Sequence, residues 1–252
     1  MACGRQTVMD ETRRRRPLAV DSKAESASPI GSEKFGCITE RGYMVVPSGL
    51  DSQCLCELGG LLDTSHPGER NLLDVPVIRR LARSRAIRSV MEPVMGSNCF
   101  AVRGVLFNKT GVANWKVAWH QDCVIAVAEP KEVPGWGPWS IKAGVHHVRP
   151  NSDLMSNMMA IRIHVDECGT DNGPLRVLPG SHTRGFLSDT QIQDWPKENA
   201  IACTARRGDA VLMRPLLLHS SSAAKAPSSR RIVHLEFAAE ELPDGVRWRD
   251  QV

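Results

Sequence analysis

NWKVAWHQD, residues Asn114 to Asp122, ends a strand-like run with a histidine and an aspartate two positions apart. In a strand, side chains at positions i and i+2 lie on the same face, so His120 and Asp122 point to one side. They offer one neutral imidazole and one carboxylate to the same ion. Such pairs are common at strand ends without a metal, so a third ligand must come from elsewhere in the chain.

His219 is the candidate for the third ligand. It ends the strand-like run AVLMRPLLLH, far along the chain from Asp122, and a sheet that folds back on itself brings distant strand ends together. Two histidines and one carboxylate on one face of the metal form the ligand set of non-haem Fe(II) oxygenases, which leaves three positions open. A closed structural zinc site has no such room. We call His120, Asp122 and His219 the triad.

The chain around the triad predicts a mainly β fold with flanking helices, as a jelly roll or barrel. After Gly96, short apolar or alternating runs are separated by Gly, Pro, Asn and Ser. The runs are CFAVRGVLFN, WKVAWHQD, MMAIRIHVDE, LRVLPG, DAVLMRP, LLLHSS and RRIVHLEF. Before Gly96, apolar residues recur at helical spacing in residues 55–62 and again in residues 77–94, which predicts two helical regions.

The first 38 residues differ in composition from the rest. They combine the run Arg13 to Arg16 with DSKAESASPIGSEK, which has few large apolar groups to offset the entropy of ordering. We expect residues 1–38 to be a disordered tail and residues 39–252 to form a single domain. A length of 252 residues and a hydrophobic content of 42% suit one large globular domain.

Charge and cysteine content limit the expected partners and compartment. The 32 basic and 28 acidic residues leave a formal charge of +4, which gives little support for binding to nucleic acid. No apolar run approaches the roughly 20 residues that cross a bilayer, so no membrane partner is expected. Eight cysteines without a signal-peptide pattern indicate reduced thiols in a cytoplasmic protein. The expected partner is a small-molecule substrate, and the oligomeric state stays open.

A 2-oxo acid bound to the metal would need a cation for its remote carboxylate. A guanidinium suits this role because it makes two parallel charge-assisted hydrogen bonds. Arg230 and Arg231, at the start of RRIVHLEF, are the candidates. Arg231 shares its strand face with apolar residues, whereas Arg230 shares its face with His234 and Glu236. The alternation alone leaves the choice between the two arginines open.

Three segments together resemble the phytanoyl-CoA hydroxylase family of Fe(II)/2-oxoglutarate dioxygenases. They are NWKVAWHQD, DNGPLRVLPGSH (Asp171 to His182) and LLLHSSSAAKAPSSRRIVHLEF (Leu216 to Phe237). They occur in the family's order, and the resemblance extends from about Gly36 to Glu240. It implies a double-stranded β-helix of the cupin-like, jelly-roll type. It also implies Fe(II), 2-oxoglutarate and O₂, which together hydroxylate a small molecule with release of succinate and CO₂.

The resemblance also implies roles for single residues. Carried over position by position, it gives the triad as the iron ligands and catalytic residues. It gives Arg230 as the partner of the C5 carboxylate of 2-oxoglutarate, and Ser221 as the donor of a further hydrogen bond to that carboxylate.

Three other features concern the wall of the pocket. Lys116 has the strand parity of His120 and Asp122, so it is a candidate for co-substrate binding, although a solvent-facing alternation is the alternative. Members of the resembled family that hydroxylate an acyl-CoA or ectoine place a tryptophan where this chain has Arg162, which changes the shape of the pocket. The long segment Glu129 to Asp153 is expected to cover the iron as a substrate-selecting lid.

Several remaining histidines are expected to lie outside the metal site. The pair His164 and Asp166 repeats the HxD pattern, but a structural or wall role is favoured over iron ligation. Adjacent histidines in an extended segment point to opposite sides, which disfavours a shared ion. The histidines assigned to no metal role are His146, His147, His182 and His234.

Two other classes of function remain open from the sequence. A cupin-like hydrolase or isomerase could use the triad with another divalent metal, but it would not need an arginine at the position of Arg230. A non-catalytic ligand-binding barrel would tolerate the loss of a metal ligand, and none is lost here.

Overall fold

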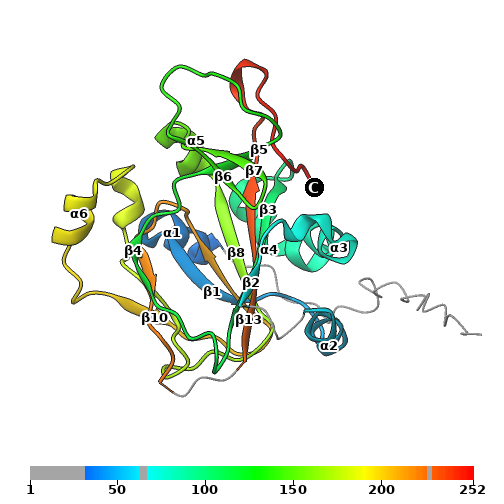
Figure 1. Cartoon of the computed structure of the whole chain (residues 1–252). Coiled ribbons are helices and arrows are strands. Elements are labelled where there is room, and N and C mark those ends of the chain that lie inside the picture. Colours follow the sequence, from blue (N-terminus) through cyan, green and yellow to red (C-terminus); the bar gives the residue numbers. More distant parts are fainter. Residues whose placement is uncertain (1–31, 63–66, 226–228) are drawn as a thin grey trace, which may run out of the picture.

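The computed structural model describes residues 32–62, 67–225 and 229–252 (Figure 1). Residues 1–31, most of the expected tail, lie outside this part. Residues 32–38, which composition assigns to the tail, belong to helix α1 (Ser32–Arg41). Ile38 is only 1% exposed and packs in the main apolar core, which explains why this segment is helical.

Two antiparallel sheets form the framework. The larger sheet has the strand order β1-β11-β8-β13-β3-β2, and the smaller has the order β10-β9-β12-β4. The strands of the larger sheet are β1 (Tyr43–Pro47), β11 (Asp209–Met213), β8 (Met159–His164), β13 (Arg230–Ala238), β3 (Phe100–Lys109) and β2 (Gly68–Glu69). Those of the smaller sheet are β10 (Ile201–Cys203), β9 (Leu175–Val177), β12 (His219–Ser221) and β4 (Val117–His120).

Helices pack on one face of the larger sheet through their apolar sides. In α2 (Ser52–Leu61), α3 (Pro76–Arg83) and α4 (Arg85–Met95), the residues Leu58, Ile78 and Ile87 are fully buried in the same core as strand residue Leu235. Gly96, with φ 85°, ends α4. The other helices are α5 (Ser152–Asn157), α6 (Asp189–Asp194) and the 3₁₀ turns η1 (Leu72–Asp74), η2 (Ser181–Arg184) and η3 (Pro243–Gly245). No described helix is long and apolar enough to span a membrane.

Strand β13 separates the helix-covered face from the site. Its residues Val233, Leu235 and Phe237 belong to the main core under the helices. The alternate residues Arg230, His234 and Glu236 are also buried, but they belong to no apolar cluster and meet polar partners. This alternation turns one face of the larger sheet into the polar wall of a pocket.

The segment predicted as a lid is largely a β-hairpin. Strands β5 (Ile125–Val127), β7 (Val145–Val148) and β6 (Trp139–Lys142) form a third sheet in the order β5-β7-β6. The hairpin turns through Ala143 and Gly144, with φ values of 48° and 75°, as a tight two-residue connection between twisted strands requires. Trp136 and Trp139 pack against a second apolar cluster. This packing anchors the hairpin to the body of the protein.

Candidate active site

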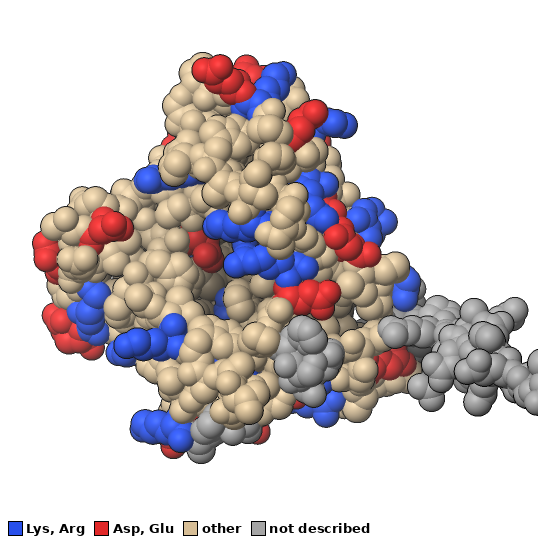
Figure 2. Space-filling model, viewed as in Figure 1, with Lys and Arg blue, Asp and Glu red and all other residues tan. Residues whose placement is uncertain are grey.

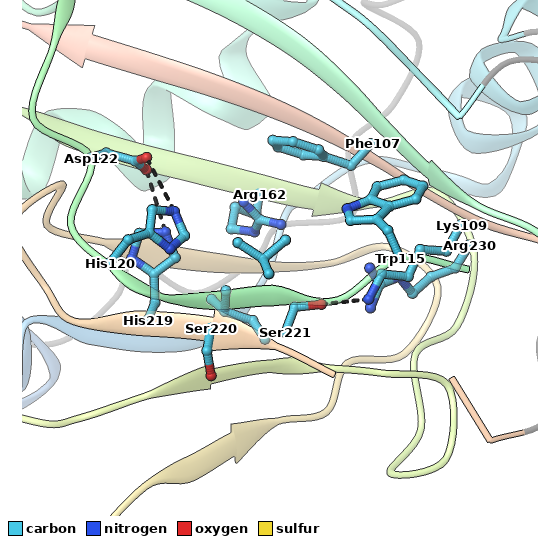
Figure 3. Close-up of a pocket in the computed structure, with 12 residues that line it drawn as sticks. Phe107, Lys109, Trp115, His120, Asp122, Arg162, His219, Ser220, Ser221 and Arg230 are labelled. Atoms are coloured by element: carbon cyan, nitrogen blue, oxygen red, sulfur yellow. Dashed lines mark hydrogen bonds and ion pairs between the residues drawn. The ribbon is translucent and has the colours of Figure 1, made fainter. Parts of the chain in front are cut away.

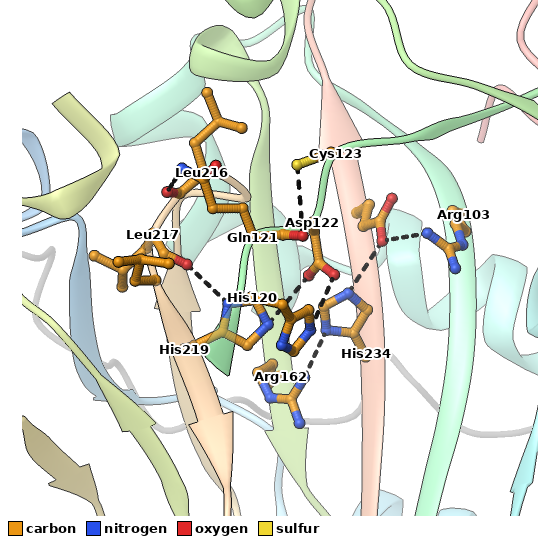
Figure 4. Close-up of polar contacts among 12 residues, drawn as sticks. Arg103, His120, Gln121, Asp122, Cys123, Arg162, Leu216, Leu217, His219 and His234 are labelled. Carbon is orange, nitrogen blue, oxygen red and sulfur yellow. Dashed lines mark hydrogen bonds and ion pairs between the residues drawn. The ribbon is translucent and has the colours of Figure 1, made fainter. Parts of the chain in front are cut away.

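The triad is assembled where β4 pairs with β12. His120 ends β4, His219 begins β12, and the two are cross-strand partners. Asp122 lies just beyond β4, where its backbone N–H donates to the carbonyl of Pro215 at 2.9 Å. Its Oδ1 is 3.8 Å from Nε2 of His120, and its Oδ2 is 3.6 Å from Nε2 of His219 (Figure 4). The structure therefore brings the three predicted residues together.

Both imidazoles of the triad are held in one orientation by backbone carbonyls. Nδ1 of His120 donates to Ala118 at 2.9 Å, and Nδ1 of His219 donates to Leu217 at 2.8 Å. Because the proton is on Nδ1, Nε2 of each ring keeps its lone pair for a metal. Burial lowers the pKa of His219 to about 4. This ring is therefore neutral near pH 7, as a metal ligand must be.

The donor set of the triad fits a divalent cation such as Fe(II). Burial opposes ionisation of Asp122, but His219 and His120 outweigh it, so the pKa of this carboxyl lies below its usual range. Among the described residues, a second group that could hold a metal shares Asp122 and adds His234 and Glu236. Glu236 already pairs with Arg103 at 2.9 Å, so the triad is the better metal site.

A pocket extends from the triad to Arg230 (Figure 3). Arg230 is 3% exposed, and its guanidinium donates to the carbonyls of Asn172, at 3.1 Å, and Gly173. These bonds fix a cation at the opposite end of the pocket from the metal ligands. The lining residues are Phe107, Lys109, Trp115, Val117, His120, Asp122, Arg162, Leu175, His219, Ser220, Ser221 and Arg230.

Lys109 is one of the polar strand residues upstream of the metal pair that the sequence makes candidates for the wall of a co-substrate cavity, and it does line the pocket. It is the cross-strand partner of Arg230, and its Nζ donates to Oγ of Ser221 at 2.6 Å and to the carbonyl of Ser222. Burial and the charge of Arg230 lower the pKa of Lys109 to about 8. The alternation of β3 places Lys109 on the face of Phe107, but its pairing with Arg230 depends on a register that the sequence does not reveal. Ser221 lines the pocket as expected.

The prediction that Lys116 faces the co-substrate pocket is wrong. Lys116 is exposed, precedes β4 and does not line the pocket. Ser221 pairs with Val117 although His219 pairs with His120, so β4 carries one extra residue at this point. Such a bulge reverses the alternation of side chains. Val117 therefore faces the pocket.

Arg231 does not line the pocket. Its Nε and NH2 donate to the two carboxylate oxygens of Asp166 at 2.8 and 2.7 Å. This ion pair engages the aspartate of the second HxD pattern. His164, the histidine of that pattern, is buried but is absent from both groups that could hold a metal among the described residues. Of the two candidate arginines, Arg230 is the one beside the site.

Comparison with known proteins assigns this chain to a family and finds similar relatives and solved structures. The phytanoyl-CoA dioxygenase (PhyH) family model matches residues 63–232, which is more than half of the chain. The ectoine dioxygenase of Sphingopyxis alaskensis is 24% identical over 290 aligned positions, covering 96% of this chain and 88% of that protein. Dioxygenase cnsJ of Penicillium expansum is 31% identical over 80 residues, which are 32% of this chain and 23% of that protein. The match therefore spans less than a quarter of that relative.

Among solved structures, the fold is similar to that of EctD from S. alaskensis in a crystal structure with 2-oxoglutarate and 5-hydroxyectoine. It superposes with a TM-score of 0.63 at 20% sequence identity, over 90% of this chain and 85% of that chain. This likeness concerns the fold. It confirms the predicted double-stranded β-helix with flanking helices.

Proposed function

The chain belongs to the phytanoyl-CoA dioxygenase (PhyH) family of Fe(II)- and 2-oxoglutarate-dependent oxygenases, and we propose that His120, Asp122 and His219 hold its iron. EctD structures contain Fe, and 2-oxoglutarate with 5-hydroxyectoine, which supports the same cofactor and co-substrate here. The observation that carries the proposal is the pocket itself. The triad lies at one end of it and buried Arg230 at the other.

Each end of the pocket suits one end of the co-substrate. Iron, 2-oxoglutarate and O₂ supply the oxidising chemistry that hydroxylates a substrate and releases succinate and CO₂. The two imidazoles and the carboxylate of the triad would hold and orient the metal. Arg230, with Lys109 and Ser221 beside it, binds the remote carboxylate. The protein therefore fixes the co-substrate by both of its charged ends.

The prime substrate is proposed to be a small molecule that enters beside the β6–β7 hairpin. Lys142, next to the turn of this hairpin, has its pKa lowered by burial and by Arg103 and Arg70, and Asp122 acts in the opposite direction. The hairpin is joined to the segment that carries Asp122, because β7 pairs with β5, which begins three residues after Asp122. Figure 2 shows basic side chains gathered beside a hollow in this face of the molecule. The hairpin thus supports the role of a substrate-selecting cover.

The direct test uses protein loaded with Fe(II) without oxygen. Addition of 2-oxoglutarate should produce a weak visible metal-to-ligand charge-transfer band, and admission of O₂ should then produce succinate slowly even without prime substrate. The band requires only the open metal positions and the pocket. If neither band nor succinate appears while Zn²⁺ or Mn²⁺ supports another reaction, the cupin-like hydrolase or isomerase is favoured. If no metal binds, the non-catalytic barrel is favoured.

The affinity for 2-oxoglutarate should fall as the pH rises above about 8. Lys109 has a pKa of about 8, so it is an ammonium ion below this pH and is neutral above it. A bound carboxylate stabilises the charged form, so binding weakens by up to about tenfold per pH unit above the pKa of the free protein. Titration of the charge-transfer band from pH 7 to 9 measures this.

Lys109→Met is the matched control for this pH dependence. The variant should bind 2-oxoglutarate about tenfold more weakly at pH 7, because it lacks a charge-assisted hydrogen bond. Its affinity should also stay constant where that of the wild-type protein falls. The same pH profile in both proteins would assign the titration to another group.

A further inference from the structure

A chain of hydrogen-bonded polar side chains lies beside the triad (Figure 4). It runs from Arg103 through Glu236 and His234 to Arg162. NH1 of Arg103 donates to Oε1 of Glu236 at 2.9 Å, and the same oxygen lies 3.3 Å from Nε2 of His234. Nδ1 of His234 lies 3.2 Å from NH1 of Arg162. Glu236 and His234 are 4% and 2% exposed, so water has little access to either side chain.

The hydrogen-bond donors and acceptors around His234 determine which ring nitrogen carries the proton. A guanidinium has no acceptor, so NH1 of Arg162 must donate and Nδ1 of His234 must accept. Nε2 then carries the proton and donates to Glu236. The negative charge of Glu236 is balanced by Arg103. The chain therefore holds Arg162 through a neutral histidine of one tautomer.

Arg162 lies in the pocket between the triad and Arg230 (Figure 3). It is 8% exposed, and its guanidinium lies 4.9 Å from the centre of the Phe107 ring. Among the residues that the structure describes, Arg162 forms no ion pair and its buried Nε has no hydrogen-bond partner. A buried guanidinium without a carboxylate is costly unless a ligand supplies the charge.

The charges in the pocket identify what Arg162 faces. The pocket contains three basic residues, Lys109, Arg162 and Arg230, and Asp122 as its one acidic residue. Lys109 and Arg230 are cross-strand partners at the remote end. Arg162 instead bonds to His234, and a ring nitrogen of His234 lies within 4.8 Å of a carboxylate oxygen of Asp122. Its guanidinium therefore serves the metal end of the pocket.

We propose that Arg162 binds the metal-chelating 1-carboxylate of 2-oxoglutarate, and that His234 and Glu236 are positioning residues that hold its guanidinium there. The proposal rests on the proposed function, since it assumes a 2-oxo acid between the triad and Arg230. It assigns the two ends of the co-substrate to different arginines, Arg162 and Arg230. Arg162 is also the residue that replaces the tryptophan expected from the family resemblance, so the proposal gives this difference a role.

Two keto acids can show which carboxylate is bound by Arg162 and which by Arg230. 2-Oxopentanoate has the chelating end of 2-oxoglutarate but lacks the remote carboxylate. With anaerobic Fe(II)-loaded protein, we expect Arg162→Met to weaken both keto acids by about the same factor, tenfold or more. Arg230→Met should weaken 2-oxoglutarate alone. Dissociation constants come from the charge-transfer band and from calorimetry, so the test does not depend on turnover.

Each other outcome has a definite meaning. If Arg162→Met weakened 2-oxoglutarate alone, Arg162 would share the remote carboxylate, and the proposal would be wrong. Unchanged affinity for both acids would also overturn it and would leave the guanidinium for the prime substrate. A wild-type protein that binds Fe(II) but neither keto acid would refute the proposed function itself, and the role of Arg162 with it.

Two substitutions of His234 test the positioning. In His234→Asn, the amide oxygen can replace Nδ1 as the acceptor for Arg162. In His234→Gln, the amide nitrogen can replace Nε2 as the donor to Glu236, but the acceptor for Arg162 is lost. We expect the Asn variant to retain more affinity for 2-oxopentanoate than the Gln variant, at equal iron content. Equal affinities would remove His234 from this role.

A measurement on the wild-type protein keeps the proposal testable if the variants fail to fold. A crystal structure with Fe(II) and 2-oxoglutarate, grown without oxygen, should place a guanidinium nitrogen of Arg162 within hydrogen-bond distance of the 1-carboxylate. A 1-carboxylate bound by iron and not by Arg162 would overturn the inference.

Discussion

His219→Ala should produce a folded protein that no longer holds Fe(II) and forms no succinate. In the proposed site His219 is one of three protein ligands, and the bond from its Nδ1 to the carbonyl of Leu217 orients the ring toward the other two. Loss of a residue that merely supports a ligand typically costs 10–100-fold in metal affinity, so loss of the ligand itself should cost more than about 100-fold. Iron content after gel filtration and the charge-transfer band measure the effect.

The variant is expected to fold because the ring of His219 contributes no charge to the interior. Its pKa of about 4 keeps it neutral, and after its removal Asp122 keeps His120 as a neighbour at 3.8 Å. His182→Ala is the matched control and should keep full iron content, since His182 bonds to the carbonyl of Thr39, does not line the pocket and belongs to neither group that could hold a metal among the described residues. Wild-type iron content in His219→Ala, with normal circular dichroism, would remove His219 from the metal site.

The sequence predicted which three residues the structure brings together because their chemistry and their strand positions agree. An HxD pair at a strand end and a histidine at a second strand end are both local features. The fold adds only the pairing of β4 with β12, which makes His120 and His219 partners. The short runs between turn residues predicted the mainly β fold for the same reason, since each run carries its own alternation.

The rest of the site depends on register, which the sequence does not reveal. The extra residue in β4 reverses the face of every residue before it, so Lys116 is exposed and Val117 lines the pocket. Lys109 joins the site only through its pairing with Arg230. A one-residue shift between β3 and β13 would have removed it from this position.

The hydrogen-bonded side chains from Arg103 to Arg162 show a second limit of prediction from the sequence. The sequence placed His234 and Glu236 on the face of Arg230, which is correct. It could not show that this face is buried, nor that Arg103 and Arg162 from two neighbouring strands complete the chain. A histidine and a glutamate two residues apart on a strand are more often exposed, so the pattern alone indicated no function.

Arg230→Met and Arg231→Met should have opposite effects, although the two arginines are adjacent. Arg230 lines the pocket, is 3% exposed and is held by backbone carbonyls that cannot neutralise its charge. A bidentate bond to the remote carboxylate of 2-oxoglutarate would involve two charge-assisted hydrogen bonds. Its loss should raise the dissociation constant of the co-substrate by about 100-fold or more, while iron content stays unchanged.

Arg231→Met should leave the affinity for 2-oxoglutarate within about twofold of wild type, because Arg231 lies outside the pocket. Its guanidinium pairs with Asp166, with side-chain exposures of 15% and 22%. Removal of one partner leaves a partly buried carboxylate unpaired, so the free energy of unfolding should fall by about 2 kcal/mol. Thermal denaturation and co-substrate titration on both variants separate the two effects. If Arg231→Met weakened the co-substrate more than Arg230→Met, the remote carboxylate would have to bind outside this pocket.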